Sequence, residues 1–349
     1  MDSAELDLPE DSSPASPACA SCKTPLYGEV YKTPLCPECR QAFIRFPIPK
    51  WIKAFGGGIL LLLLFCLVTL PRNLRTGIHH KRGMEAMAQR KFSTAQKELE
   101  AVVKAEPKFL EAQCRLIIAA FYNGDLITMQ KAYAAVVDKT IDDEDLIGQV
   151  QDVLAKTVTY LPSDSLLAFI EAKHTSLDSS TSFELTQYLQ KQPGDQYAMT
   201  MLASRLMDAK EYEASDRVLQ QCLALDRTYN PALAVMIPLK RERLQFDSAL
   251  YYADRVLANN RESAYGYGAK ARILLKAKKD AEALKVVKEG LAIDSHDPYC
   301  LATLAIAYHY TGDLKHRDAL LKQAATDSTL TSPFSFASDV ISGKEAFRN

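Results

Sequence analysis

The chain has 349 residues, enough for two domains or one elongated array. Its 42 basic and 43 acidic side chains nearly cancel, so the overall charge gives no support to nucleic acid as a partner. Four of its eight cysteines are clustered and four are scattered, a distribution unlike that of a disulfide framework.

Residues 1–17 are predicted to be a disordered acidic tail. The segment reads MDSAELDLPEDSSPASP, in which acidic residues, serine and proline leave little apolar surface to bury. Such a composition cannot offset the conformational entropy that folding removes.

Residues 18–46 are predicted to form a small metal-binding module. Two Cys-x-x-Cys pairs within this segment are separated by thirteen residues. A gap of two residues lets one tight turn present two thiolates, and Zn²⁺ favours four such ligands at the corners of a tetrahedron. The intervening PLYGEVYKTP suits a short hairpin, and the RQAFIRF that follows suits a short helix ended by Pro47.

This paired motif resembles the zinc-ribbon and treble-clef families. The resemblance implies a structural Zn²⁺ held by Cys19, Cys22, Cys36 and Cys39. Because the protein supplies all four ligands, such a site is closed and not catalytic. The alternatives are two disulfides in an exported segment and, less favoured without a βαβ context, a redox pair. The few scattered basic residues of this segment do not favour nucleic acid.

Residues 51–71 are predicted to be a single transmembrane helix. From Ala54 the sequence reads AFGGGILLLLLFCLVTL, without a charge, and eleven of these seventeen residues are Leu, Ile, Phe or Val. Counted from Trp51, the stretch reaches about 30 Å as a helix, the thickness of a hydrocarbon core. A buried helix of a soluble core is the alternative. A signal peptide would begin nearer the amino terminus.

The flanking charges do not orient this helix, because four basic residues lie on each side. Zinc-binding thiolates persist best in a reducing compartment, which places the amino terminus in the cytoplasm and the rest outside. We therefore expect a single-pass protein of a bacterial inner membrane with a periplasmic carboxyl-terminal domain. Cys114, Cys222 and Cys300 have no evident partners there, and their apolar surroundings predict that they are buried.

Residues 72–82 are predicted to be a basic linker at the membrane surface, and residues 83–328 a helical repeat domain. Four similar segments begin at Lys210, Leu244, Lys278 and Gly312, each 34 residues after the one before. At the same period Ala203, Ile237, Ala271 and Ala305 superpose, as do other apolar positions.

This pattern resembles the tetratricopeptide repeat. The resemblance implies a mainly α fold, a solenoid of paired antiparallel helices whose concave face binds proteins or peptides. Residues 142–193 match poorly and are read as degenerate. Arg317 replaces a usual small residue, which indicates a solvated last unit, and residues 329–349 are predicted to be a tail or a cap.

Six residues are candidates for partner binding. Tyr197, Tyr265 and Tyr299 share one repeat position, which by the resemblance faces the concave groove. Arg241, Arg272 and His309 occupy positions expected to line the same groove. An aromatic column with polar neighbours suits a peptide ligand. The alternative is that the tyrosines only pack against the adjacent unit.

The leading hypothesis is a membrane-anchored scaffold for protein–protein interaction. We found no glycine-rich phosphate loop, no His-Glu-x-x-His and no Gly-x-Ser-x-Gly, so nothing indicates an enzyme. The alternative is a transmembrane sensor whose zinc module contacts nucleic acid or a regulatory partner.

Overall fold

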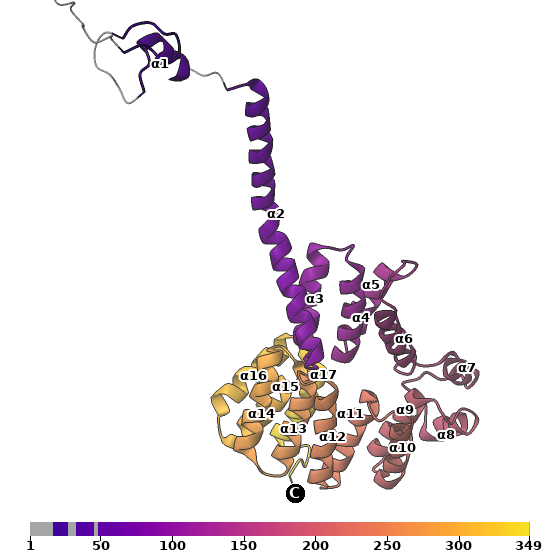
Figure 1. The fold of residues 1–349 in the computed structure, drawn as a ribbon. Coiled ribbons are helices and arrows are strands. Elements are labelled where there is room, and N and C mark those ends of the chain that lie inside the picture. Colours follow the sequence, from indigo (N-terminus) through magenta and orange to yellow (C-terminus); the bar gives the residue numbers. More distant parts are fainter. Residues whose placement is uncertain (1–16, 27–32, 45–47, 349) are drawn as a thin grey trace, which may run out of the picture. The chain divides into compact units, whose positions relative to one another are not determined.

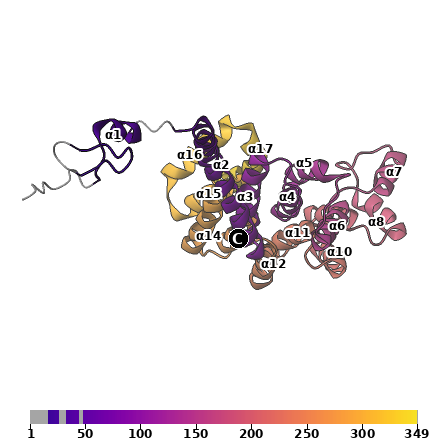
Figure 2. The same cartoon turned by 45° about the horizontal axis from the view of Figure 1, so that its top comes forward.

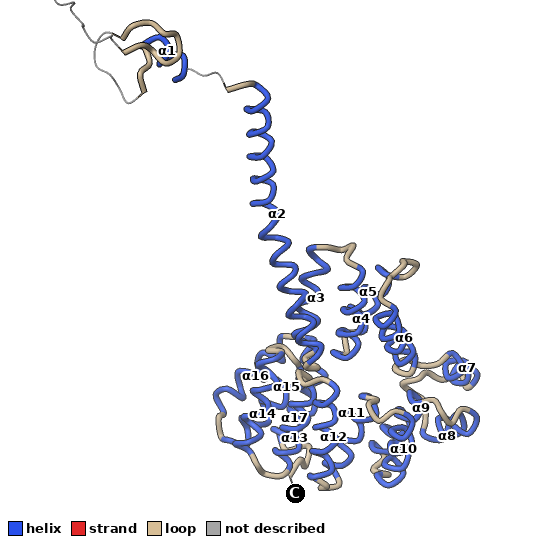
Figure 3. Tube along the Cα trace, viewed as in Figure 1, coloured by secondary structure: helices blue, strands red, loops and turns tan. Residues whose placement is uncertain are grey.

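A computed structural model describes residues 17–26, 33–44 and 48–348, and the chain divides into two compact units, Met1–Arg72 and Asn73–Asn349. Seventeen helices and no β-strand are found in this described part (Figure 3). The predicted disordered tail lies outside it, apart from Pro17.

The first unit contains a short helix and a turn around the cysteine pairs. Helix α1, Pro37–Ile44, begins with proline, whose fixed φ suits the first helical position. It therefore starts before the predicted RQAFIRF segment. An isolated antiparallel bridge joins Ala18 to Pro25, and most of the predicted hairpin, residues 27–32, lies outside the described residues.

Helix α2, Lys50–Ala88, is 39 residues long. Its early residues expose large apolar side chains, including Trp51 at 70%, Phe55 at 66% and Leu61 at 70%. Within the described part, no helix is long and apolar enough to cross a membrane. The predicted span at 51–71 falls only partly in that part, because the side chains of residues 67–72 lie outside it.

The end of α2 belongs to the second unit and opens its helical array. Residues 73–82, predicted as a linker, are helical. His79 Nδ1 lies 2.6 Å from Glu98 Oε2. A side chain at Gly83 would meet Leu99 at 3.0 Å, so glycine allows α2 to pack closely on the next helix.

The helices that follow are less regular than those of the later repeats. They are α3 (Phe92–Ala105), α4 (Leu110–Asn123), α5 (Leu126–Val136), α6 (Glu144–Val158), α7 (Asp164–Ala172) and α8 (Ser182–Lys191). Those between residues 142 and 193 are of unequal length and do not keep the 34-residue spacing.

The second half of this unit is strictly periodic. Its first helices begin 34 residues apart, as α9 (Gln196–Asp208), α11 (Asn230–Glu242), α13 (Ala264–Lys276) and α15 (Pro298–Thr311). Its second helices do the same, as α10 (Tyr212–Leu225), α12 (Phe246–Asn259), α14 (Asp280–Ile293) and α16 (Leu314–Thr326). Successive pairs lie side by side in both views (Figures 1 and 2). The predicted mainly α array of helix pairs is confirmed.

One backbone conformation recurs between the two helices of each pair. Lys210, Leu244 and Lys278 have φ of 63°, 58° and 62°, and Gly312, at the same repeat position, has 80°. A left-handed residue here ends the first helix and lets the next amide bond back to it, as the Lys279 amide does to the Leu274 carbonyl at 2.9 Å.

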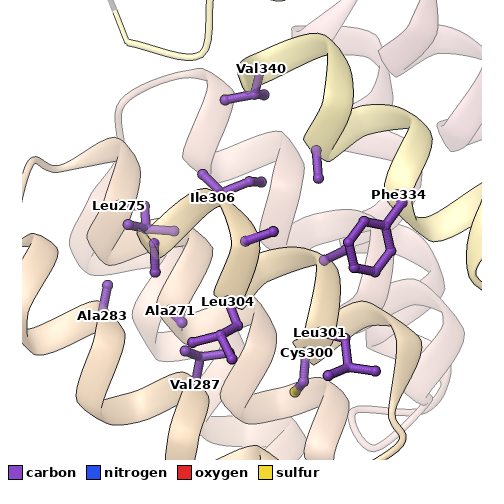
Figure 4. Packing of buried hydrophobic residues seen from close by; sticks show 14 of the residues in the cluster. Ala271, Leu275, Ala283, Val287, Cys300, Leu301, Leu304, Ile306, Phe334 and Val340 are labelled. Carbon is purple, nitrogen blue, oxygen red and sulfur yellow. The ribbon is translucent and has the colours of Figure 1, made fainter. Parts of the chain in front are cut away.

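Small side chains bring neighbouring pairs close together. Ala203, Ala271 and Ala305 are fully buried, and the core around Ala271 joins α13, α14, α15 and the last helix (Figure 4). Cys114, Cys222 and Cys300 are also buried, as predicted.

The array also contacts itself across a long stretch of sequence. The Asn260 side-chain oxygen accepts from the Phe92 amide at 3.2 Å, and Glu262 accepts from the Thr94 amide at 2.7 Å. The Arg261 amide donates to the Arg90 carbonyl at 2.9 Å. The start of α3 is thereby fixed to the turn between α12 and α13.

The chain ends in helix α17, Ser328–Ser342, followed by residues 343–348. Four side chains of α17 are buried in the core of the last repeats: Leu330, Phe334, Ala337 and Val340.

Gly290 provides a test of the close packing, because a β-carbon there would lie 2.9 Å from Cys300 Sγ and 3.0 Å from Tyr267 Cβ. Gly290→Ala is expected to lower the free energy of unfolding by about 1–3 kcal/mol through overpacking. Gly148, helical with open space around it, is the matched control, and Gly148→Ala should raise stability by up to about 1 kcal/mol. The midpoints of denaturant unfolding are compared for the two variants. An equal shift of the midpoint in both would contradict the packing argument.

Candidate functional site

The four clustered cysteines converge in the first unit. The sulfur atoms of Cys19, Cys22, Cys36 and Cys39 all lie within 4.8 Å of one another. Cys36 immediately precedes α1 and Cys39 lies in its first turn, so the helix start delivers the second pair. The turn of the first pair is fixed by Lys23, whose φ is 64° and whose amide donates to the Cys19 carbonyl at 2.9 Å.

Backbone amides point at these sulfurs. The Cys36 amide donates to Cys19 Sγ at 3.3 Å, and the Cys39 amide donates to Cys36 Sγ at 3.4 Å. Hydrogen bonds from the amides of Cys22 and Cys36 lower the pKa of Cys19 to about 6, since they favour its thiolate. Hydrogen bonding with the Cys36 and Cys22 sulfurs raises the pKa of Cys39 to about 12.

This donor set fits a tetrahedral metal ion. With metal–sulfur bonds of about 2.3 Å, sulfurs at tetrahedral corners lie about 3.8 Å apart. The Cys22 and Cys36 sulfurs are 3.6 Å apart, and all four cysteines are free thiols. Thiolates crowded in this way repel one another, and a divalent cation removes that repulsion. The four cysteines are therefore able to bind one metal ion.

The second unit brings together four of the six candidate partner-binding residues. The Tyr265 and Tyr299 rings are 5.0 Å apart, and the Arg272 guanidinium lies 3.8 Å above the Tyr299 ring. Arg241 and Arg272 both face the Phe336 ring of α17, at 6.0 and 5.0 Å. These side chains come from α11, α13 and α15 and form one cluster.

Burial limits what this cluster can contact. Arg241 is 6% exposed and Arg272 is 7% exposed. Burial lowers the pKa of Arg272, whose Nε donates to Thr303 Oγ1 at 2.8 Å and whose Nη2 has no protein partner. The Tyr265 hydroxyl donates to the Ala234 carbonyl at 3.1 Å. Tyr265 and Tyr299 pack against neighbouring helix pairs, and their role in partner binding stays a prediction.

Tyr197 and His309 lie apart from this cluster. Tyr197 packs against a buried cluster formed by side chains of α7, α8 and α9. His309 Nδ1 is 3.4 Å from Arg317 Nη1, and burial with the charges of Arg317 and Arg348 lowers the pKa of His309.

A further set of residues, absent from the sequence candidates, surrounds the cluster. Glu242, Lys276 and Tyr310 occupy one repeat position on α11, α13 and α15, 34 residues apart. Phe347 and Arg348, after α17, contact this row. The 34-residue spacing was the available signal for the row, whereas nothing in the sequence indicated that the carboxyl-terminal residues return to it.

Glu242 is the acidic centre of this row. It pairs with Arg241 at 2.8 Å and with Lys276 at 2.9 Å. Burial alone would raise the pKa of Glu242, but attraction to Arg241 and the hydrogen bond from Lys276 outweigh burial, so the pKa is lowered. One carboxylate thus compensates two cations in a partly buried setting.

Comparison with known proteins finds a distant similarity to solved structures, some of them repeat proteins. No family model matches this chain, and no curated protein does. A tetratricopeptide repeat protein from Parabacteroides merdae is 12% identical, with a TM-score of 0.39 over 76% of this chain and 99% of that one. For pilF of Pseudomonas aeruginosa the identity is 11% and the TM-score 0.33, over 79% of this chain and 100% of that one.

The MamA protein is 16% identical, with a TM-score of 0.31 over 63% of this chain and 92% of that one. Similarities at this level carry no argument about function. The repeat architecture rests on the regular helix starts of the chain itself.

Glu242→Gln is expected to lower the free energy of unfolding by about 1–3 kcal/mol at pH 7, because two charged hydrogen-bond partners lose their anion. A carboxyl whose pKa is lowered on folding stabilises the protein above about pH 4.5, and that contribution is lost as the pH falls through the folded-state pKa. The variant should therefore lose less stability than the parent between pH 6 and pH 3.

Urea unfolding across this pH range measures the difference. Glu282→Gln, in the exposed first turn of α14, is the control and should keep the parent's pH dependence. Parallel curves for Glu242→Gln and the parent would contradict the assignment.

Proposed function

We propose that this chain is a membrane-anchored protein-interaction scaffold. Its helical array binds proteins or peptides outside the cytoplasm, and a structural zinc module lies on the cytoplasmic side of a single span. The observation that carries the binding role is the row of equivalent positions on successive first helices, since a stack of helix pairs presents side chains at regular intervals to an extended ligand.

Zinc is the metal that the cysteine cluster suits best. Four thiolates at tetrahedral spacing are the ligand set of structural zinc sites, and the amide-to-sulfur hydrogen bonds orient those ligands. With four protein ligands no position is open for water or substrate. The ion would therefore hold the first unit together, because Cys19 is the one buried side chain among the described residues of that unit.

The anchor is supported by the side chains at the start of α2. Seven consecutive large or aliphatic residues, 59–65, are each between 46% and 70% exposed. A helix that is apolar on all sides needs an apolar surrounding, and a run of this size on a water-exposed surface is unfavourable. In the sequence, Leu67, Val68 and Leu70 continue the same apolar run.

Purified under reducing conditions, the full chain is expected to carry about one zinc per molecule. Cys22→Ser and Cys36→Ser should each lose most of that zinc, because a three-thiolate site binds it far less tightly. Cys66→Ser, which changes a cysteine outside the cluster, is the control and should keep it. Elemental analysis and a colorimetric assay measure the zinc content of the parent and of each variant. A parent chain without zinc would rule out the zinc module.

The binding role is tested with a photo-crosslinking residue in the full chain in cells. Placed at Tyr197 or His309, it should trap a discrete partner that sediments with membranes and carries an export signal. Placed at Lys285, on the exposed side of α14, it is the control and should not. Equal trapping at all three positions would contradict the binding role, and capture of cytoplasmic proteins alone would contradict the orientation.

A further inference from the structure

The carboxyl-terminal residues turn back onto the first helices of the last repeats. Helix α17 ends at Gly343, whose φ of 77° reverses the chain, and the Glu345 amide donates to the Asp339 carbonyl at 3.0 Å. Residues 343–348, here called the tail segment, leave the helix at this point. They follow α17, and Phe347 is buried in the same core cluster as the apolar face of that helix.

Phe347 is held by side chains from three successive first helices. It is 2% exposed. Its ring lies 5.8 Å from the Arg241 guanidinium of α11, 5.3 Å from Lys276 Nζ of α13 and 6.2 Å from the Tyr310 ring of α15. The aromatic face thus lies among cations, an arrangement that stabilises both.

Arg348 is held by a different set of groups. Its Nε donates to the Leu275 carbonyl at 2.7 Å, near the end of α13, and that carbonyl also accepts from the Lys278 amide at 3.0 Å. Its two Nη atoms donate to the two carboxylate oxygens of Asp280, the first residue of α14. Its guanidinium also lies 3.5 Å above the Tyr310 ring. Bidentate pairing and ring stacking together are specific for arginine.

The receiving surface is therefore built from two adjoining parts. One takes an aromatic ring and the other takes a guanidinium. Repeat positions of the array form both parts, and Phe336 of α17 adds a ring 5.9 Å from the Phe347 ring. We call it the docking surface, and it consists of Arg241, Glu242, Leu275, Lys276, Asp280 and Tyr310.

The tail segment is held in a way that permits exchange. Arg348 and Asp280 keep 15% and 26% of their side-chain surface exposed, so water and competing ions reach the pair. The connection through Gly343 to Ala346 adds few contacts: Gly343, Lys344 and Glu345 are exposed to solvent. A segment in trans with the same two side chains would find the same contacts.

We propose that the docking surface binds a partner protein through a segment in which an aromatic residue is followed directly by arginine. That segment replaces the chain's own Phe347 and Arg348. The proposal rests on the binding role proposed above for the array and names the chemistry of its ligand. In the absence of the partner the tail segment occupies the surface, so the partner must compete with a ligand tethered at high local concentration.

The test uses a fluorescent peptide of the tail sequence, GKEAFRN, and the full chain with and without residues 345–349. The shortened chain should bind this peptide at least tenfold more tightly than the parent, because its own competitor is gone. Peptides with alanine for the phenylalanine, or aspartate for the arginine, should bind the shortened chain at least tenfold more weakly. Fluorescence anisotropy gives the affinities, and circular dichroism confirms that the helices are retained.

A charge-reversal variant distinguishes specific recognition of the peptide's arginine from nonspecific binding of the peptide. In the shortened chain, Asp280→Arg should reverse the preference, so that the aspartate peptide binds better than the arginine peptide. Glu282→Arg, on the same helix, is the control and should leave the preference unchanged. If the shortened chain does not fold, the full chain with Phe347→Ala and Arg348→Ala takes its place, since it keeps Glu345, whose amide donates to the Asp339 carbonyl of α17.

Equal peptide binding by parent and shortened chain, or no loss with the altered peptides, would overturn the proposal. A dimer of the parent that dissociates when the tail is removed would also overturn it, because the occupant would then be a second copy of this chain. After any of these results, the crosslinking test at Tyr197 and His309 still decides the binding role independently.

Discussion

The close approach of neighbouring helices at a few small residues is the constraint on which the array depends. Gly268, Gly290 and Cys300 meet where α13, α14 and α15 touch, and a β-carbon at either glycine would lie about 3 Å or less from the Cys300 sulfur or the Tyr299 ring. This spacing fixes how far each pair advances on the one before. It therefore fixes which side chains of successive first helices fall into one row, and the docking surface includes one such row, Glu242, Lys276 and Tyr310.

Electrostatics explains why the chain covers the docking surface with aromatic side chains. Arg241, Arg272 and Lys276 gather positive charge in a region with little access to water, and Glu242 is the acidic group paired with two of them. Desolvated cations need compensation, and aromatic faces provide part of it. Phe336 of α17 and Phe347 of the tail segment supply these faces. They thereby help to stabilise the cations that the repeats bury.

The periodic features were predictable from the sequence, and the contacts that break the period were not. Spacing alone predicted the helix pairs from α9 to α16, because each pair buries the same pattern of residues, and two Cys-x-x-Cys pairs predicted the convergence of four sulfurs. The left-handed turn positions at Leu244 and Lys278 were not apparent, since neither residue is glycine, the residue that most readily adopts this conformation. The return of Phe347 and Arg348 was also hidden, because a short polar tail carries no periodicity that would place it.

The contact between the start of α3 and the turn at Asn260 changes how the array is expected to fold. In an open stack each repeat touches only its neighbours, so stability accumulates along the chain and ends can fray independently. Here Phe92 and Asn260, separated by 168 residues, are joined by a hydrogen bond at a buried position. Closing that loop requires most of the intervening helices to be ordered first, which raises the contact order and slows folding. The helices between these two points thereby become one cooperative unit, in which losing any helix pair from α4 to α12 loosens the contact between α3 and the turn before α13.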